Sequence, residues 1–245
     1  MTDRVRSLAG AAAFVDRVGL ALVFAKEAVA LPSLFEAVAG PRPTPWVEER
    51  ADGKLVMTPE LSMVWAWKDE LAERRLACVG KHLRGWPSLV SLRLLPALYA
   101  LTGRSGTADD FRDTVLPPIE REVAEAVLDI APADSRDIRQ AVGRQRAATV
   151  SRAIDSLQRQ LVLTRAGTIH RNQGWPGTAY DILARRHPLG RLPRPDDARV
   201  ELAATVLRSA GGLSAADLSR ALGFARTEST AALERLAAGK WPATP

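Results

Sequence analysis

The order of elements predicted for residues 117–183 constrains the fold more than any other feature of the sequence. Two prolines open a helix predicted over 119–130, and a capped short helix over 136–142 ends at a glycine. A turn then leads to a longer helix over 147–161, and two apolar runs within 162–183 predict a β-hairpin. Short helix, turn, longer helix and hairpin is the order typical of a winged helix-turn-helix unit.

Similar patterns flank this segment on both sides. Toward the N-terminus, apolar periodicity and turn residues predict three helices followed by two strands, over residues 13–24, 31–38, 58–71, 76–82 and 87–91. After residue 195 the series of helix, glycine, short helix, glycine and longer helix recurs, with a Ser214–Asp217 capping box and little chain left for a hairpin. We therefore expect a mainly α fold with small β-hairpins (α+β), built from tandem winged helix-turn-helix units.

Two segments rich in glycine, proline and arginine read as linkers between these patterns, at residues 103–107 and 191–195. They predict three domains: an N-terminal winged-helix-like domain, a central winged helix-turn-helix domain and a C-terminal helix-turn-helix-like domain, over residues 1–106, 107–191 and 195–245.

Composition excludes several classes of protein. The single cysteine, Cys78, leaves no disulfide framework and no cysteine-rich zinc site, which favours a reducing cytoplasm, and we expect it to be a buried apolar residue. The apolar stretch 8–30 is interrupted by charges and fits neither a secretory signal nor a membrane span. His82, His170 and His187 are scattered, and we interpret them as unrelated surface or hairpin histidines. A glycine-rich phosphate loop is absent. We expect a soluble protein with no metal, no cofactor and no membrane contact.

Basic charge is concentrated in one part of the chain. Between Arg136 and Arg194 there are twelve arginines and three aspartates, with no lysine and no glutamate. This segment carries about +9 of charge, whereas the whole chain has a net charge of +6. A GC-rich genome explains the use of arginine in place of lysine, but it does not explain the clustering. A basic patch on an otherwise mildly acidic protein predicts contact with a polyanion.

The helix predicted over 147–161 divides into two faces. Val150, Ile154, Leu157 and Leu161 form an apolar stripe, and polar or guanidinium side chains occupy the opposite stripe. Such groups can bind base edges and phosphates, although an ordinary solvated surface has the same pattern. With the basic residues of the turn and the hairpin, the candidate nucleic-acid-binding residues are Arg144, Gln145, Arg146, Thr149, Arg152, Ser156, Arg159, Arg165 and Arg171.

Two adjacent carboxylates, Asp69 and Glu70, are candidates for catalysis. They lie near the end of a predicted helix that also carries Trp65 and Trp67. A carboxylate beside aromatic rings could orient a water molecule while a ring stacks on an extruded base, in a pocket lined by Trp67 or Trp86. The alternative is that Trp65 packs inward and the charges belong to an ordinary helix surface.

Three stretches of the chain resemble a known family: Phe14–Gly19, Trp65–Leu71, and Gly80–Gly85 followed by Pro96–Leu101. They are similar to winged-helix proteins related to the YcaQ/AlkZ DNA glycosylases. The resemblance implies a tandem winged-helix array that binds DNA and, in the glycosylases, hydrolyses the N-glycosidic bonds of alkylated bases. Those enzymes use a Gln-aliphatic-Gln motif that this chain lacks. Its Gln158-Arg159-Gln160 has arginine in the middle and is interpreted as accidental, so no catalytic residue carries over.

We therefore expect a monomeric protein that binds double-stranded DNA in damage recognition or repair, with glycosylase activity as one form of that role. Its expected location is cytoplasmic and nucleoid-associated. The alternative is a non-enzymatic winged-helix transcriptional regulator, and a winged-helix scaffold for protein assembly is a third hypothesis. Clustered arginines count against the scaffold, and a dimerisation helix or ligand pocket typical of a regulator is not evident in the sequence.

Overall fold

The structure is a computed structural model that describes residues 4–41, 45–143, 146–172, 175–210 and 212–239. About 50% of the chain is helical, and the strands form small antiparallel sheets. The prediction of a mixed α+β fold is therefore confirmed at this level. Among the described residues, no helix combines the length and hydropathy that crossing a bilayer requires.

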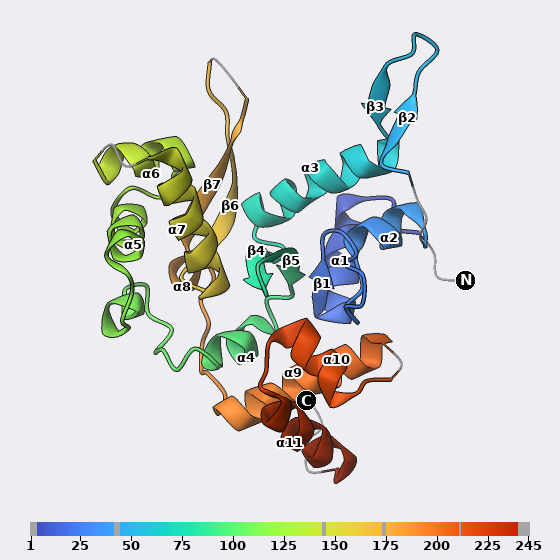
Figure 1. The fold of residues 1–245 in the computed structure, drawn as a ribbon, viewed down its shortest axis with the longest axis vertical. Helices are drawn as coiled ribbons and strands as arrows, with labels where there is room; N and C mark the ends of the chain where they lie inside the picture. The colour runs from blue at the N-terminus through green and yellow to red at the C-terminus, as the bar shows by residue number, and fades with distance from the viewer. Residues whose placement is uncertain (1–3, 42–44, 144–145, 173–174, 211, 240–245) are drawn as a thin grey trace.

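The N-terminal region places three helices around a three-stranded sheet (Figure 1). Its elements are α1 (Leu8–Val18), β1 (Leu20–Leu22), α2 (Leu34–Ala39), α3 (Pro59–Glu73), β4 (Cys78–Leu83) and β5 (Trp86–Val90). The strand order is β1-β5-β4, all antiparallel, so β5 is the central strand. Thr58 caps α3, because its hydroxyl accepts a hydrogen bond from the Leu61 amide at 3.3 Å.

The single helix predicted over 13–24 is wrong. Helix α1 ends at Val18, and Gly19 leaves the helical conformation with φ +75°. The next three residues then pair with β5, from Leu20 opposite Val90 to Leu22 opposite Ser88. All three residues of β1 are buried. A short strand that is buried on both faces shows no alternation of apolar and polar residues. The apolar residues on either side of Gly19 therefore matched a helical period by chance, although the helix ends at the glycine.

A second hairpin, absent from the prediction, lies between α2 and α3. Strands β2 (Val47–Glu49) and β3 (Leu55–Met57) pair antiparallel and project from the body of the protein, as Figure 1 shows. The turn is closed by the amide of Gly53, which donates to the carbonyl of Arg50 at 2.9 Å. The Asp52-Gly53 pair is a recognised hairpin signal in the sequence.

The central region follows the predicted order of elements. After α4 (Leu95–Ala100) and a short 3₁₀ helix (Asp110–Asp113), it consists of α5 (Pro118–Ile130), α6 (Ser135–Ala141), α7 (Ala147–Arg159), β6 (Leu163–Ile169), β7 (Gly177–Ile182) and α8 (Leu183–Arg186). The N-cap of α6 is Asp134, whose carboxylate accepts from the amides of Arg136 and Asp137. Val150, Ile154 and Leu157 of the predicted apolar stripe are buried against α5 and the β6–β7 hairpin, whereas Leu161 lies beyond the end of α7 and is buried in the core shared with the C-terminal helices.

The C-terminal region contains α9 (Pro195–Ala210), α10 (Ala215–Leu222) and α11 (Arg226–Ala237). The predicted capping box at Ser214 and Asp217 is present. This region shares a core with the N-terminal sheet. Val200, Leu218 and Phe224 belong to the same buried cluster as Leu20 and Tyr99. The first and last parts of the chain therefore pack as one body.

Two hairpins stand on the same side of the molecule with α3 between them. Figure 1 shows β6–β7 rising from the central region and β2–β3 rising from the N-terminal region, while the C-terminal helices lie at the opposite end. This arrangement determines where a large ligand can approach α3.

Candidate nucleic-acid interface

Helix α3 buries one face and presents the other toward the β6–β7 hairpin. Leu61, Val64 and Leu71 pack in the N-terminal core. Trp65 and Asp69 are one turn apart on another side of the helix. The indole of Trp65 is 51% exposed, so it does not pack inward. It extends an aromatic wall that includes the ring of Phe24, whose centroid is 6.3 Å away.

Strand β6 passes close to the end of α3 because of a glycine. Gly167 has φ +121°, and a Cβ atom at this position would lie 2.9 Å from the Cβ of Glu73. A larger residue would push the two elements apart. Arg186 holds the same contact, since its Nη2 donates to the carbonyls of Ala72, Glu73 and Ala166 at 2.6, 3.1 and 3.0 Å. The hairpin is thereby fixed beside α3.

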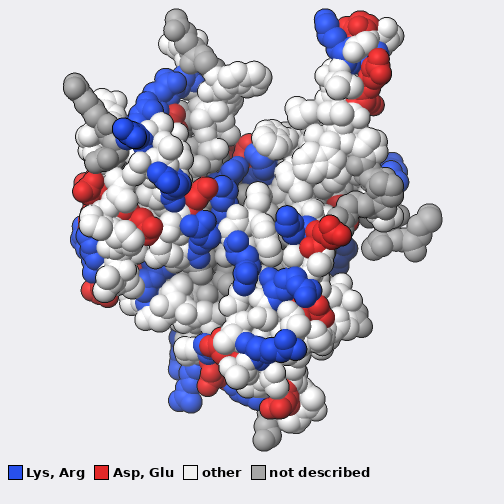
Figure 2. All heavy atoms as spheres, in the orientation of Figure 1, with Lys and Arg blue, Asp and Glu red and all other residues white. Residues whose placement is uncertain are grey.

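A cleft of about 590 Å³ opens between α3 and the β6–β7 hairpin. Figure 2 shows this hollow between the two projecting hairpins, with side chains of both charges at its base. Trp65 lines one wall, and the other wall includes Thr168, His170 and Trp175, whose indole is 95% exposed. A volume of this order and two exposed indoles suit a flat aromatic ligand such as a nucleobase.

Three charged groups form the floor of the cleft. The carboxylate of Asp69 accepts from Lys68 Nζ at 2.7 Å and from Arg165 Nη1 at 3.4 Å. The Lys68 ammonium also lies 4.5 Å from the ring centroid of Trp65, a cation–π contact. Burial lowers the pKa of Lys68, and the hydrogen bond to Asp69 opposes that shift. Asp69 is thus an acceptor held in place by two cations, with about two of its four lone-pair positions left for other donors.

The other residues considered for a catalytic pocket lie in different environments. Glu70 also lines the cleft, and it pairs with Arg74 at 3.2 Å in a solvent-exposed salt bridge. Trp67 packs against the N-terminal core, and Trp86 packs against the core shared with the C-terminal helices. The aromatic residues of the cleft are therefore Phe24, Trp65 and Trp175 in place of the pair named from the sequence. In the sequence, the helical spacing of Trp65 and Asp69 was the signal that could have identified the α3 wall of the cleft.

The second half of α7 packs against β4 of the N-terminal region. Lys81 Nζ donates to Asp155 at 2.6 Å, and the Lys81 amide donates to the Gln158 side chain at 3.2 Å. His82 Nδ1 lies 2.9 Å from the Gln158 carbonyl. Gln158 is buried in this joint, which gives it a packing role and agrees with the interpretation of Gln158-Arg159-Gln160 as accidental.

Two buried histidines and the buried cysteine in this part of the structure are uncharged at neutral pH. Burial, the largest cause, lowers the pKa of His82 to about 4 and that of His187 to about 3. Both rings are buried, so the interpretation of these two as surface or hairpin histidines is wrong. Burial raises the pKa of the Cys78 thiol to about 12, and the prediction of a buried apolar cysteine is confirmed. Within the described ranges, no group of three or more His, Cys, Asp or Glu side chains could hold a metal ion.

The nine candidate nucleic-acid-binding residues fall into separate groups. Arg144 and Gln145 lie outside the described residues. Arg146, Arg152 and Arg159 are exposed on α7 or at its start, and none of the three makes an ion pair with another described residue. Thr149 and Ser156, the other two candidates on this helix, are half-buried. The Ser156 hydroxyl accepts a hydrogen bond from Gln160 Nε2 at 3.1 Å.

The two candidate arginines on the hairpin already form ion pairs with carboxylates. Arg165 pairs with Asp69 in the floor of the cleft. Arg171 donates to Asp134 at 3.0 Å and to Asp137 at 2.6 Å, the two carboxylates of the capping box of α6. The hairpin arginines therefore fix the position of the hairpin relative to α3 and α6.

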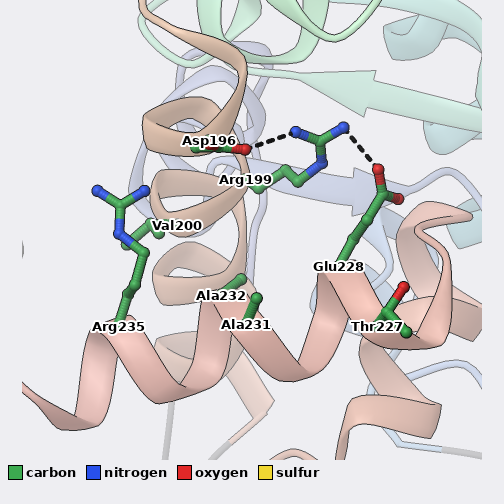
Figure 3. Close-up of a pocket in the computed structure, with 8 residues that line it drawn as sticks. All are labelled: Asp196, Arg199, Val200, Thr227, Glu228, Ala231, Ala232 and Arg235. Carbon is green, nitrogen blue, oxygen red and sulfur yellow. Dashed lines mark hydrogen bonds and ion pairs between the residues drawn. The ribbon is translucent and has the colours of Figure 1, made fainter.

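A second hollow, of about 470 Å³, lies between α9 and α11 (Figure 3). Arg199 extends across it and donates to Asp196 at 3.1 Å and to Glu228 at 2.6 Å. Arg235 on the same helix as Glu228 pairs with Asp197 at 2.7 Å. Both guanidinium groups are neutralised by carboxylates, so this hollow is a joint between two helices and the cleft beside α3 is the better candidate site.

Comparison with known proteins places the chain in a family. A family model described as AlkZ related matches residues 5–223, which is most of the chain. A search of curated proteins finds no match, and neither does a search of solved structures. The matched range includes α3, the cleft and the whole of the central region. The resemblance stated from the sequence is confirmed, and the chain belongs to the AlkZ-related family.

Proposed function

We propose that this protein binds double-stranded DNA and acts in DNA damage recognition or repair. Membership of the AlkZ-related family suggests a DNA repair or glycosylase-like role. The observation that carries the proposal is the exposed arginine face of α7, whose guanidinium groups make no ion pair with other described residues, and the cleft with aromatic walls between α3 and the β6–β7 hairpin adds to it. Guanidinium groups free of carboxylates are available to phosphates, and exposed indoles are available to bases.

We further propose that the molecule is a tandem winged-helix protein with domains over residues 1–106, 107–191 and 195–245. The series α1, β1, α2, α3, β4, β5 with strand order β1-β5-β4 supports this for the first domain, and α5, α6, α7, β6, β7 supports it for the second. The shared core then means that the third domain docks on the first. A monomer in the cytoplasm, associated with the nucleoid, is part of the same proposal.

Salt-dependent binding tests the DNA proposal. We expect wild-type protein to bind a duplex with an affinity that falls as salt rises. Replacing both Arg152 and Arg159 by Ala should reduce the slope of log affinity against log salt by about 0.9 for each phosphate that no longer binds a guanidinium group. The matched control is Arg191→Ala with Arg194→Ala, two exposed arginines outside α7 that also lack ion pairs with described residues. Equal slopes for the two double variants would contradict the proposal.

Glycosylase activity is the second candidate function, and the floor of the cleft favours it. Asp69 lines the same cleft as the two indoles that could hold an extruded base, and it keeps acceptor capacity for a water molecule. Hydrolysis of the N-glycosidic bond would place that water at the anomeric carbon and release the free base. The pairing with Lys68 and Arg165 would position the carboxylate during this step.

Release of bases from alkylated duplexes, detected by alkaline cleavage at abasic sites, tests this candidate. We expect Asp69→Asn to lower the rate by about 100-fold or more, the usual effect of losing general acid–base assistance. Glu70→Gln is the matched control, because its carboxylate already pairs with Arg74 in solvent. If wild-type protein binds DNA but releases no base, the glycosylase hypothesis is wrong and the non-enzymatic regulator becomes the better account of DNA binding.

A further inference from the structure

We propose that the DNA-binding surface continues beyond the central region, through Arg84 in the β4–β5 turn to Arg226 at the start of α11. With Arg152 and Arg159 these residues form what we term the arginine band, a single track for the phosphate backbone of a duplex. The inference rests on the proposed DNA binding and extends it to residues that the sequence pattern did not single out.

The band starts on α7. Arg152 and Arg159 are seven residues apart, which is two helical turns and about 10 Å along one face. Both side chains are exposed. The Nε of Arg152 donates to the carbonyl of Ala148 within its own helix at 3.2 Å, and its terminal nitrogens make no hydrogen bond with another described residue. This face is opposite the buried stripe of α7 and beside the joint with β4.

Arg159 lies across the β4–β5 turn. A Cβ atom at Gly85 would be 3.1 Å from Cδ of Arg159, so the arginine stem rests on the glycine backbone. Arg84 precedes that glycine and is exposed. The last residue of α7 therefore contacts the turn that carries Arg84, although Arg84 and Arg159 are 75 residues apart in the sequence.

The conformation of Arg84 is itself unusual. Leu83 pairs with Trp86, so Arg84 and Gly85 form a two-residue hairpin loop, with φ +56° and +84°. Such loops favour Asn, Asp or Gly in the first position, and a left-handed arginine costs roughly 1 kcal/mol. The turn alone would be more stable with asparagine. Three other non-glycine residues, Ala28, Arg75 and Leu161, also have positive φ, so the strain at Arg84 adds to the argument only together with its exposure and position.

The band then reaches the C-terminal helices. A Cβ atom at Gly223, the left-handed C-cap of α10, would lie 3.1 Å from Cδ of Arg84. Arg226 begins α11 three residues later and is exposed. Figure 2 shows basic side chains on this face running from α7 past the β4–β5 turn to the corner between α10 and α11.

The charges of the band are not neutralised by neighbouring carboxylates. Among the described residues, its four arginines make no ion pair, whereas nearby acidic groups are engaged elsewhere. Asp155 pairs with Lys81, Asp217 with Arg220, and Glu228 with Arg199. Trp86, beside the β4–β5 turn, packs against the core and does not offer an exposed ring on which single-stranded bases could stack. The band therefore suits the regularly spaced phosphates of a DNA duplex better than the bases of a single strand.

The test compares binding of a duplex by wild-type protein, Arg84→Asn, and Arg84→Asn with Arg226→Gln. We expect the double variant to lower the slope of log affinity against log salt by about 1.8, and to reduce affinity at least about tenfold at 0.1 M salt. Arg84→Asn should retain or raise the thermal midpoint, because asparagine suits the left-handed position. Weaker binding by a protein that is no less stable separates a contact with DNA from a folding effect.

Arg191→Gln with Arg194→Gln serves as the control that removes the same charge outside the band. If Arg152 and Arg159 contribute to the slope but Arg84 and Arg226 change it no more than this control does, the band is overturned while the proposed DNA binding stands. If the Arg84 and Arg226 variant loses only binding to a single strand, the duplex track is also overturned. A wild-type protein that binds no duplex overturns both proposals together.

Discussion

Two groups of arginines come from one stretch of sequence, yet the structure uses them in different ways. Arg152 and Arg159 on α7 are exposed and make no ion pair with other described residues. Arg165 and Arg171 on the β6–β7 hairpin are paired with carboxylates, and Arg186 after the hairpin donates to three backbone carbonyls. The first group faces solvent, and the second group ties the hairpin to α3 and α6.

The difference limits what net charge can predict. A count of charges treats the twelve arginines of this stretch as equivalent. It predicts the sign of the partner's charge, but it does not predict which surface of the protein binds that partner. The carboxylates that neutralise the hairpin come from other elements, as Asp69 of α3 does for Arg165. The exposed Arg159 in turn contacts a turn from outside the stretch, the β4–β5 turn that carries Arg84. Binding surfaces are therefore set by which charges stay unpaired after folding.

Among the arginines that hold the hairpin in place, Arg186 should give the largest loss of stability when it is replaced by Met. The side chain is buried, and its removal leaves the carbonyls of Ala72, Glu73 and Ala166 without this donor. We expect the free energy of unfolding to fall by roughly 3 kcal/mol, the cost of stranding buried acceptors of a charged donor. Chemical denaturation measured at neutral pH gives this quantity.

Arg152→Met is the control, because it makes the same substitution on the exposed face of α7. Its unfolding free energy should stay within about 0.5 kcal/mol of wild type, as for most surface positions. The two variants should behave oppositely in DNA binding, with Arg152→Met the weaker binder whenever both are folded. Equal decreases in stability would mean that the two groups of arginines are not distinct.

The fold was predictable where local signals were strong. The central region follows the sequence because helix caps and glycines mark its boundaries, as at Asp134 and Gly143. Strand β1 was missed because Leu20, Ala21 and Leu22 are all buried and show no alternation. Hairpin β2–β3 carried a signal, Asp52-Gly53, but its strands are short and mostly exposed.

The candidate site was less predictable, since it depends on contacts between distant residues. Asp69 could be singled out as a carboxylate near aromatic residues, but its partner Arg165 lies 96 positions away. The choice between Trp65 and Trp67 depended on which face of α3 meets the N-terminal core. Likewise, the proximity of Arg84 to Arg159 follows from packing of α7 on β4, which no local pattern encodes.

Acid should weaken the joint that holds α7 and its exposed arginines against β4. Burial lowers the pKa of His82 to about 4, below the value of about 6.5 expected in an unfolded chain. Between these values the unfolded state binds more protons, so stability decreases as pH falls from about 6.5 toward 4. The contribution of His82 to this decrease is about 1.4 kcal/mol per pH unit, or roughly 2 kcal/mol by pH 5, and the buried His187 adds to it; denaturation across this range measures the sum.

Two variants identify the histidine responsible. His82→Gln should be less stable than wild type at pH 7, since the contact with the Gln158 carbonyl is altered, but its stability should depend less on pH. His170→Gln, which changes an exposed ring in the cleft, should keep the wild-type dependence. A pH profile that His82→Gln leaves unchanged would assign the acid sensitivity to another group, such as the buried His187.

Asp134→Ala tests whether a paired arginine can be converted into an exposed one. The change removes the N-cap of α6, which should cost about 1 kcal/mol in unfolding free energy. It also leaves Arg171 with Asp137 as its remaining carboxylate partner among the described residues. If pairing is what distinguishes the hairpin arginines from those of α7, the partly released guanidinium should contact phosphate and steepen the salt dependence of duplex binding.

Asp129→Ala, on the exposed surface of α5, removes the same charge without releasing an arginine and should leave the slope unchanged. A slope that rises equally in both variants would mean that total charge, and not the release of a particular arginine, controls binding.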